Sequence, residues 1–253
     1  MELQDKTILI TGASSGLGRA MATALAGRSN RFILTARRAS LLEEVARELE
    51  ALGSRCLVCP ADATDPLAAA AVIDAGIAEF GPIDLAILNA GGGTPLNMAE
   101  APVDAVIGIM RKNYETLVNS LCPMIAHMKD AGGVIAYTGS PAGFFGLPRS
   151  GPYSAAKAAG RVLFDSCRIE LAGTKTRLVA LYPGFALTDG INPDDVPVKS
   201  LIISKERAAR EMIGAIERER AHTMFPKRIR FLMAFGRMLP EPVRRWILGR
   251  AAG

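Results

Sequence analysis

The sequence predicts an α/β domain built on a doubly wound parallel sheet of about seven strands, with helices on both faces. Short apolar runs alternate with longer helical patterns along the chain, as they do where crossover helices join parallel strands. A glycine-rich turn follows the first apolar run. No linker, repeat or low-complexity segment divides the 253 residues, so we expect residues 1–253 to form one domain.

The first half of the chain contains four expected strands. Residues 6–11 form an apolar run suited to a strand buried on both faces, and a helix should run from the glycine turn to about residue 27. Residues 31–36 predict the second strand, and Ser40 is expected to cap a helix that ends at residue 52. Residues 55–59 and 84–88 predict the next two strands, with a helix over residues 66–80 between them.

The second half continues the alternation. A long helix is expected over residues 102–129, followed by the fifth strand at 133–138. Another helix should run from near Pro152 to Leu171, followed by the sixth strand at 177–182. A seventh strand is expected at 222–225, before a basic amphipathic helical extension over residues 227–253. His127 and His222 are expected on a helix surface and at a strand end, without a functional role.

Composition excludes several classes of protein. Hydrophobic residues make up 49% of the chain and charged residues 22%, which argues against disorder. No apolar run reaches the roughly 18–20 residues of a membrane span, and Asp5 and Lys6 follow Met1 too soon for a signal peptide. Cys56 and Cys59 form a C-x-x-C, but on a strand they would face opposite sides. A core strand is therefore favoured there over a metal or redox site.

The net charge of +5 is unevenly distributed. Residues 201–253 contain 12 Lys or Arg against 5 Asp or Glu, whereas the first 200 residues contain 18 against 20. The basic character therefore belongs to the C-terminal part, and we expect no nucleic-acid surface on the body of the domain.

The glycine-rich turn has the pattern of a phosphate-binding loop. Gly12-Ala13-Ser14-Ser15-Gly16-Leu17-Gly18 lies between an expected strand and an expected helix. Backbone N–H groups at the positive end of a helix form a cradle for phosphate. A tight turn that binds no ligand is the alternative.

Tyr153 and Lys157 are four residues apart and lie on one face of their helix. A free tyrosine has a pKa of about 10, and a neighbouring ammonium is expected to lower it, so that the pair exchanges protons with a substrate. The hydroxyl of Ser140, at the end of the fifth strand, could bind the same substrate oxygen. An ordinary helix N-terminus with a solvated lysine is the alternative.

The ordered set of motifs resembles the short-chain dehydrogenase/reductase family, whose fold is of the Rossmann type. The match spans residues from about 5 to 190, and the intervals between its motifs fit as well as the motifs. Its members are, in order, Thr11–Gly18, Asn89-Ala90-Gly91, Asn113, Ser140, Tyr153 with Lys157, and Pro183-Gly184 with Thr188. The sequence departs from the family pattern at Leu88, Gly139 and Glu115.

The resemblance implies a catalytic role for four residues. Tyr153 would be the acid or base, Lys157 would lower its pKa and hold the nicotinamide ribose, and Ser140 would polarise the substrate oxygen. Asn113 would anchor a water molecule in a proton relay. A non-catalytic cofactor-binding regulator is the alternative, but it should have lost at least one of these four residues, and all are present.

The resemblance also implies a nicotinamide dinucleotide site and no metal. Its residues would be Gly12, Ser14, Ser15, Gly16, Leu17, Gly18, Asp62, Ala63, Asn89, Ala90, Gly91, Tyr153, Lys157, Pro183, Gly184 and Thr188. Arg37 and Arg38 end the second strand, where an NAD site would place a carboxylate, so they favour NADP(H). The alternative is that both arginines are solvated surface residues. We expect a cytoplasmic homodimer or homotetramer that packs through residues 102–129 and 153–171.

The segments expected to line the substrate site are rich in apolar residues, with Arg149 as the main charge nearby. The apolar residues are Leu96, Phe144, Phe145, Leu147, Phe185 and Ile191. They indicate a neutral, apolar carbonyl compound, with an acyl or lipid-like chain as one form. Residues 185–220, with residues 190–200 at their centre, are expected to form a lid. The extension over residues 227–253 has two interpretations. It would either cover the substrate pocket or another subunit, or lie in a membrane interface, where a membrane-surface lipid reductase would act.

Overall fold

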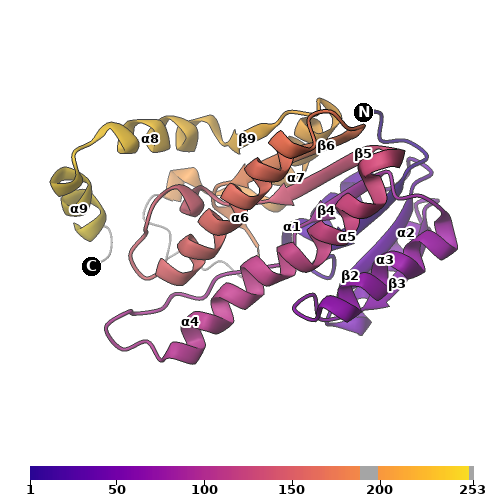
Figure 1. Ribbon diagram of the computed structural model, residues 1–253, viewed down its shortest axis with the longest axis horizontal. Helices are drawn as coiled ribbons and strands as arrows, with labels where there is room; N and C mark the ends of the chain where they lie inside the picture. Colours follow the sequence, from indigo (N-terminus) through magenta and orange to yellow (C-terminus); the bar gives the residue numbers. More distant parts are fainter. Residues whose placement is uncertain (189–198, 251–253) are drawn as a thin grey trace.

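A seven-stranded parallel sheet forms the centre of the molecule (Figure 1). The structure is a computed structural model, and it describes residues 1–188 and 199–250. The strands lie in the order β3-β2-β1-β4-β5-β6-β9. Because the order reverses between β1 and β4, the carboxyl ends of these two central strands meet where such sheets bind ligands. The strands are β1 (Thr7–Thr11), β2 (Arg31–Ala36), β3 (Arg55–Pro60), β4 (Leu85–Leu88), β5 (Gly133–Thr138), β6 (Thr176–Pro183) and β9 (His222–Phe225). The predicted fold class is confirmed.

Helices cover both faces of the sheet. Helices α1 (Gly16–Leu25), α2 (Ala39–Glu50) and α7 (Lys205–Glu217) pack on one face, and α3 (Pro66–Phe80), α5 (Thr116–Ala131) and α6 (Gly151–Glu170) pack on the other. In β1, Ile8 and Ile10 join the first core cluster while Leu9 joins the second. A strand buried on both faces needs apolar residues at successive positions, which explains the continuous apolar runs.

The C-x-x-C of β3 is divided between the two faces, as predicted. Cys56 packs against the cluster beneath α1 and α2, and Cys59 against the cluster beneath α3 and α5. Burial raises the pKa of Cys56 to about 12 and also raises the pKa of Cys59, so both thiols stay protonated at neutral pH. Both cysteines are half-buried and pack against the core from β3, which is an edge strand and not the core strand that the sequence favoured.

Two local predictions are corrected. Helix α2 begins at Ala39 with Arg38 as its N-cap residue, so Ser40 lies inside the first turn and does not cap it. His127 is half-buried and not simply on the helix surface, because its Nε2 accepts a hydrogen bond of 3.2 Å from the backbone N–H of Ile83. His222 begins β9 as expected and stacks on Tyr182.

The long helix expected over residues 102–129 is divided into three parts. Helix α4 (Val103–Met110) leads into a π-helical turn, η1 (Arg111–Glu115), before α5 begins. Within the turn, Asn113 Nδ2 donates a hydrogen bond of 2.9 Å to the carbonyl oxygen of Ile109, four residues earlier. The side chain thus occupies the carbonyl that the α-helical backbone would use, which is a recognised cause of a wider turn.

The region expected to form a lid contains different kinds of structure. Strands β7 (Ala186–Leu187) and β8 (Ile203–Ser204) form a small parallel sheet, and a short 3₁₀ helix, η4 (Lys199–Leu201), precedes β8. Helix α7 is part of the main core, with Ala208 and Met212 fully buried, so residues 205–217 do not belong to a lid. Most of the expected centre of the lid, residues 189–198, which include Ile191, lies outside the described residues.

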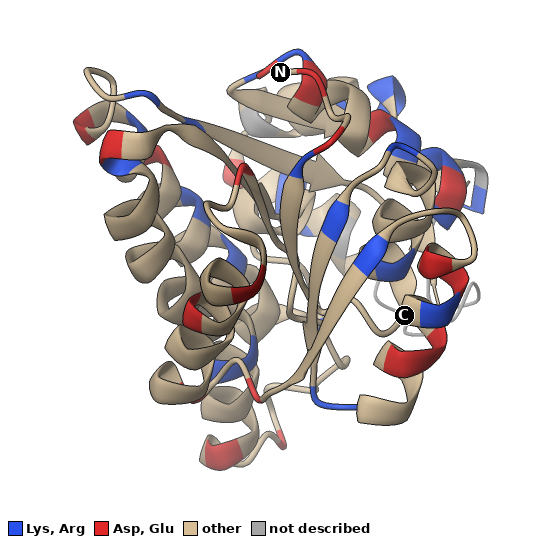
Figure 2. Ribbon diagram, turned by 90° about the vertical axis from the view of Figure 1, so that its right-hand side faces the viewer, with Lys and Arg blue, Asp and Glu red and all other residues tan. Residues whose placement is uncertain are grey.

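Helices α8 (Lys227–Met238) and α9 (Glu241–Arg250) follow β9 and extend away from the sheet at its carboxyl edge (Figure 1). Within residues 1–188 and 199–250, no helix combines the length and apolarity that crossing a bilayer requires. On the end of the molecule opposite α9, basic and acidic residues are interspersed over the helices (Figure 2).

Candidate active site

The predicted site residues come together at the carboxyl edge of the sheet. The glycine turn follows β1, Asn89 follows β4, Ser140 follows β5, and Gly184 follows β6. Tyr153 lies near the start of α6, which the short 3₁₀ helix η2 (Pro141–Phe144) joins to β5. Parallel pairing of the central strands brings these segments, distant in sequence, to one edge.

The turn after β1 packs closely against its neighbours, which requires glycine at several of its positions. Gly12 has a φ of +69°, and a Cβ there would lie 3.1 Å from the Cα of Ala90. A Cβ on Gly18 would overlap the carbonyl oxygen of Gly12. Gly16, with a φ of +57°, lies beside Thr188. A phosphate group fits such a cradle of backbone at a helix N-terminus, so these residues fit the pyrophosphate of a dinucleotide.

A guanidinium lies against the same turn. Arg38 Nη2 donates hydrogen bonds to Ser14 Oγ at 3.1 Å and to Ser15 Oγ at 2.6 Å. Arg37 is exposed and lies near Asp62, since its charge contributes to lowering the pKa of that carboxyl. The largest causes of that lowering are hydrogen bonds from the backbone N–H and the hydroxyl of Thr64.

Two buried side chains fix the turn after β4. Thr11 Oγ1 accepts hydrogen bonds from the backbone N–H groups of Asn89 at 2.9 Å and Ala90 at 3.0 Å. Asn113 is fully buried, and its amide accepts from Gly92 N and donates to Gly92 O, each at 2.9 Å. The position of the Asn89-Ala90-Gly91 turn is therefore set from both sides.

Gly91 lies between Asn113 and Lys157. A Cβ on Gly91 would lie 2.8 Å from Asn113 Oδ1 and 3.5 Å from Lys157 Nζ. Lys157 is 4% exposed, and its ammonium donates a hydrogen bond of 2.9 Å to the carbonyl oxygen of Thr138. Burial lowers the pKa of Lys157 to about 8. The lysine is therefore close to its point of titration at neutral to mildly alkaline pH.

The side chains of Tyr153 and Ser140 lie close enough for Ser140 to affect the pKa of the tyrosine. The pKa of Tyr153 is raised, not lowered as the sequence predicted, because burial penalises the phenolate, and the neighbouring Ser140 only partly offsets this effect. The ammonium of Lys157 lies 5.8 Å from the centre of the Tyr153 ring and makes its hydrogen bond to Thr138. At neutral pH the Tyr153 hydroxyl is therefore a proton donor.

Two departures from the family pattern have local explanations. A Cβ on Gly139 would lie 2.7 Å from ring atoms of Tyr182, so a serine is excluded by the tyrosine behind it. Glu115 is 47% exposed and pairs with Arg111 at 3.6 Å, whereas Asn113 in the same turn is buried. Glu115 therefore points away from the predicted catalytic residues.

The residues predicted to line the substrate site lie in three segments. Leu96 N–H donates to the carbonyl oxygen of Arg149 at 2.7 Å, which ties the segment before α4 to the loop before α6. Phe144 packs edge-to-face on Tyr182, and the Arg244 guanidinium lies 5.8 Å from the ring of Phe145. Leu147, near Phe145, and Phe185, whose carbonyl oxygen accepts from Ile203 N–H, are partly buried.

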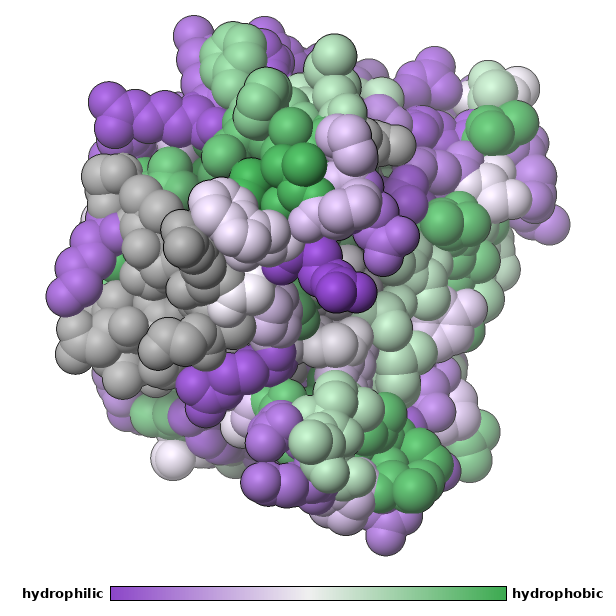
Figure 3. All heavy atoms as spheres, turned by 90° about the vertical axis from the view of Figure 1, so that its left-hand side faces the viewer, coloured by the Kyte–Doolittle hydropathy of each residue, from purple (hydrophilic) through white to green (hydrophobic). Residues whose placement is uncertain are grey.

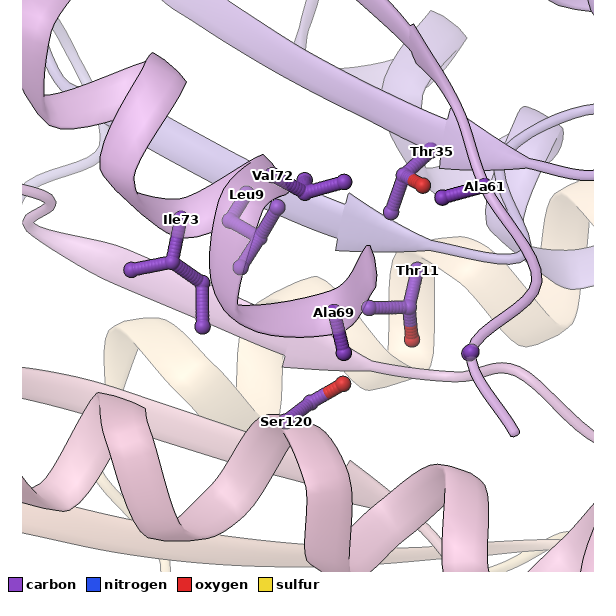
Figure 4. A pocket seen from close by; sticks show the side chains of 9 residues that line it. Leu9, Thr11, Thr35, Ala61, Ala69, Val72, Ile73 and Ser120 are labelled. Carbon is purple, nitrogen blue, oxygen red and sulfur yellow. The ribbon is translucent and has the colours of Figure 1, made fainter. Parts of the chain in front are cut away.

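A small cavity beneath the carboxyl ends of β1 and β2 is distinct from the predicted catalytic residues. It has a volume of about 10 Å³ and lies between the sheet and helices α3 and α5, with Thr11, Thr35 and Ser120 among its lining (Figure 4). This is room for about one water molecule. None of the four predicted catalytic residues lines it.

A larger hollow of about 790 Å³ lies where the edge strand β9 meets α8. Phe144 and Tyr182 form part of its lining, so Phe144 faces this hollow. None of Asn113, Ser140, Tyr153 and Lys157 lines it.

Three contributors to the site were given no role at the sequence level. Thr11 and Thr138 act through a hydroxyl and a carbonyl group that hold Ala90 and Lys157. The ring of Tyr137 lies 5.3 Å from the Lys157 ammonium. The position of Thr11 before the glycine turn is a signal for its role, but nothing in the sequence singles out Tyr137 or Thr138.

A glycine turn at the switch point of a parallel sheet, with Ser140, Tyr153 and Lys157 at the same edge, is the arrangement expected of a nicotinamide-dependent oxidoreductase. The chain belongs to the short-chain dehydrogenase family, whose model matches residues 6–195. An uncharacterised oxidoreductase of Myxococcus xanthus is 33% identical over 96% of both chains. The 11-beta-hydroxysteroid dehydrogenase 1A of Arabidopsis thaliana is 30% identical over 94% of this chain and 73% of the relative.

Solved structures show the same fold. A short-chain dehydrogenase/reductase from Burkholderia phymatum in complex with NAD has a TM-score of 0.85 at 22% identity, covering 94% of both chains. An alcohol dehydrogenase from Thermococcus sibiricus complexed with 5-hydroxy-NADP has a TM-score of 0.78 at 24% identity, covering 87% of this chain and 95% of the other.

Proposed function

We propose that this protein is an NADP(H)-dependent reductase that interconverts a carbonyl group and a secondary alcohol on a neutral, apolar substrate. One observation carries the proposal: Tyr153 packs against Gly93 and lies near Ser140 and the buried Lys157, at the same edge of the sheet as the glycine turn that fits a dinucleotide. In the reducing direction, bound NADPH supplies a hydride to the carbonyl carbon.

The residues of the chain supply the proton and the position. Tyr153 donates its hydroxyl proton to the substrate oxygen, and Ser140 holds the same oxygen by a hydrogen bond. Because burial raises the pKa of Tyr153, the proton donor is present at neutral pH, which favours reduction. Lys157, with a pKa of about 8, is suited to return a proton to the tyrosine, and Asn113 keeps the adjoining Gly92 segment in place.

The choice of NADP(H) is supported by the two arginines after β2. Arg38 already donates to the serine hydroxyls of the cradle, and no carboxylate stands at either position. A guanidinium matches a phosphate with parallel N–H donors, whereas an NAD site places an acid there to bind the ribose hydroxyl.

Self-association is proposed through α4 to α6. Val162 is 57% exposed and Ile169 is 75% exposed, and their spacing of seven residues places both on the same side of α6. Light scattering of the purified chain, beside the double variant Val162→Ser/Ile169→Ser, would give the mass with and without this surface. We expect a dimer or tetramer that the double variant weakens.

The catalytic proposal is tested by Tyr153→Phe, which removes only the hydroxyl. We expect NADPH oxidation with a panel of ketones, quinones and 3-oxoacyl compounds to fall by a factor of about 10³ or more, since general acid catalysis and the positioning of the oxygen are both lost. NADPH binding, followed by its fluorescence, should stay within about twofold. Substantial residual turnover by Tyr153→Phe would contradict the assignment, and binding without turnover by the native chain would favour the regulator.

A further inference from the structure

Helix α8 is apolar on two opposite sides. Ile229 is 4% exposed and packs towards Gly184, and Gly236 lies against Phe145, so these residues attach the helix to the body. On the outer side, Phe231, Phe235 and Met238 are 66%, 61% and 83% exposed. Their spacing of four and three residues places them on one face. A helix that only covered the core would carry polar residues there.

The exposed apolar surface continues beyond α8. On α9, Val243, Trp246 and Ile247 are 42%, 58% and 43% exposed. Figure 3 shows apolar side chains gathered at the top of this face, where α8 and α9 lie, and a second group at the bottom, where α4 lies. Among the exposed apolar residues of this part of the chain, Val103 and Ile107 lie on α4 and Met98 precedes it, and they are 72%, 42% and 53% exposed.

Both groups adjoin the segments that lead to Tyr153. A Cβ on Gly151, the first residue of α6, would lie 3.6 Å from the side chain of Met98. On the other side, a Cβ on Gly236 would lie 3.5 Å from the ring of Phe145. The two apolar groups therefore flank the carboxyl edge of the sheet on the side where the predicted catalytic residues lie.

The charge of residues 227–250 indicates which kind of partner could bind the exposed apolar surface of α8 and α9. The sequence from 227 to 250 holds seven Lys or Arg and one acid, Glu241. Among them, Lys227, Arg228, Arg230 and Arg245 are exposed. A two-fold symmetric contact would place this basic surface against its own copy, so like charges would repel. An anionic lipid surface would accept both the apolar rings and the basic side chains.

We propose that α8, α9 and the tip of α4 form a docking face for an anionic membrane surface, with the catalytic end of the sheet turned towards the lipid. The exposed rings enter the boundary between headgroups and acyl chains, while the basic side chains contact lipid phosphates. An apolar substrate dissolved in the membrane then has a short path to Tyr153. The docking itself needs no catalysis, so it stands or falls independently of the proposed reaction.

The test is cosedimentation of the full chain with vesicles of phosphatidylcholine alone, or with phosphatidylglycerol added, at low and high salt. We expect binding only to the anionic vesicles, weakened by salt. Arg228→Gln/Arg230→Gln should weaken binding by about tenfold or more, since each basic residue near such a surface contributes about fivefold. Phe231→Ser/Phe235→Ser should weaken it at least as much, because both rings lose their contact with acyl chains.

Matched controls come from surfaces elsewhere on the molecule. Leu67→Ser removes an apolar side chain that is 81% exposed on α3, and Arg47→Gln removes an exposed charge on α2. Neither should change vesicle binding by more than about twofold, and circular dichroism would establish that every variant is folded. Absence of binding by the full chain, or an equal loss in the controls, would overturn the proposal.

Sedimentation velocity without lipid separates docking from self-association. A native dimer that Phe231→Ser/Phe235→Ser converts to a monomer, with no vesicle binding, would assign the face to a second copy and would also overturn the proposal. An unchanged mass in that variant, together with lost vesicle binding, would support it.

Discussion

Asn113→Ala should destabilise the fold more than Asn119→Ala, which replaces another asparagine in the same helical region. The Asn113 side chain is fully buried and makes three hydrogen bonds of 2.9 Å, to Gly92 N, Gly92 O and Ile109 O. Each such bond contributes about 0.5–1.5 kcal/mol, and the loss leaves the Gly92 amide without its acceptor. The expected cost in the free energy of unfolding is about 2–4 kcal/mol.

A loss of that size should lower Tm by about 5–15 °C in a domain of this length. Asn119→Ala is the matched control, because Asn119 lies on α5 and makes one hydrogen bond of 3.0 Å, to the carbonyl oxygen of Ala63. It should lower Tm by only about 2–4 °C. Thermal unfolding by circular dichroism measures both variants, and hydrogen exchange should show lost protection at Gly92 in Asn113→Ala alone. Equal shifts in Tm for the two variants would refute the reasoning that Asn113 holds the 91–93 segment.

Three further predictions concern the cofactor and the buried lysine. Arg38→Asp should weaken NADPH binding, measured by fluorescence, by about tenfold to a hundredfold and leave NADH binding nearly unchanged, and equal losses for both would contradict the assignment. Gly18→Ala should abolish binding of either cofactor, seen by calorimetry, because its Cβ overlaps the carbonyl oxygen of Gly12; an alanine variant with native affinity would count against the cradle. Burial lowers the pKa of Lys157 from 10.5 in the unfolded chain to about 8, so the folded state is penalised below pH 8 and the penalty fades towards pH 10.5. The stability of Lys157→Met relative to the native chain, from urea unfolding, should therefore fall by on the order of 3 kcal/mol between pH 7 and pH 10, and a difference that does not change with pH would refute it.

The sequence by itself determined the fold class and the order of the strands along the chain. Continuous apolar runs, such as residues 31–36, are stable only in strands that are buried on both faces. The family motifs identified the glycine turn and the pair Tyr153 and Lys157. These features are local: each depends on the types of neighbouring residues and on their period. The sequence located the ends of helices and strands less accurately. At the start of α2, for example, any of several polar residues could have been the N-cap.

Only the tertiary structure decided how the site is held and charged. The π-helical turn at Asn113 depends on the Gly92 segment that the side chain reaches, and Gly139 depends on the ring of Tyr182. The direction of the pKa shift of Tyr153 depends on how deeply surrounding elements bury it, which no spacing in the sequence expresses. The outward apolar face of α8 is set by Ile229, which packs against the body of the protein from the opposite side of the helix. The physical reason is common to all four: burial and long-range contacts are set by packing between segments that are far apart in the chain.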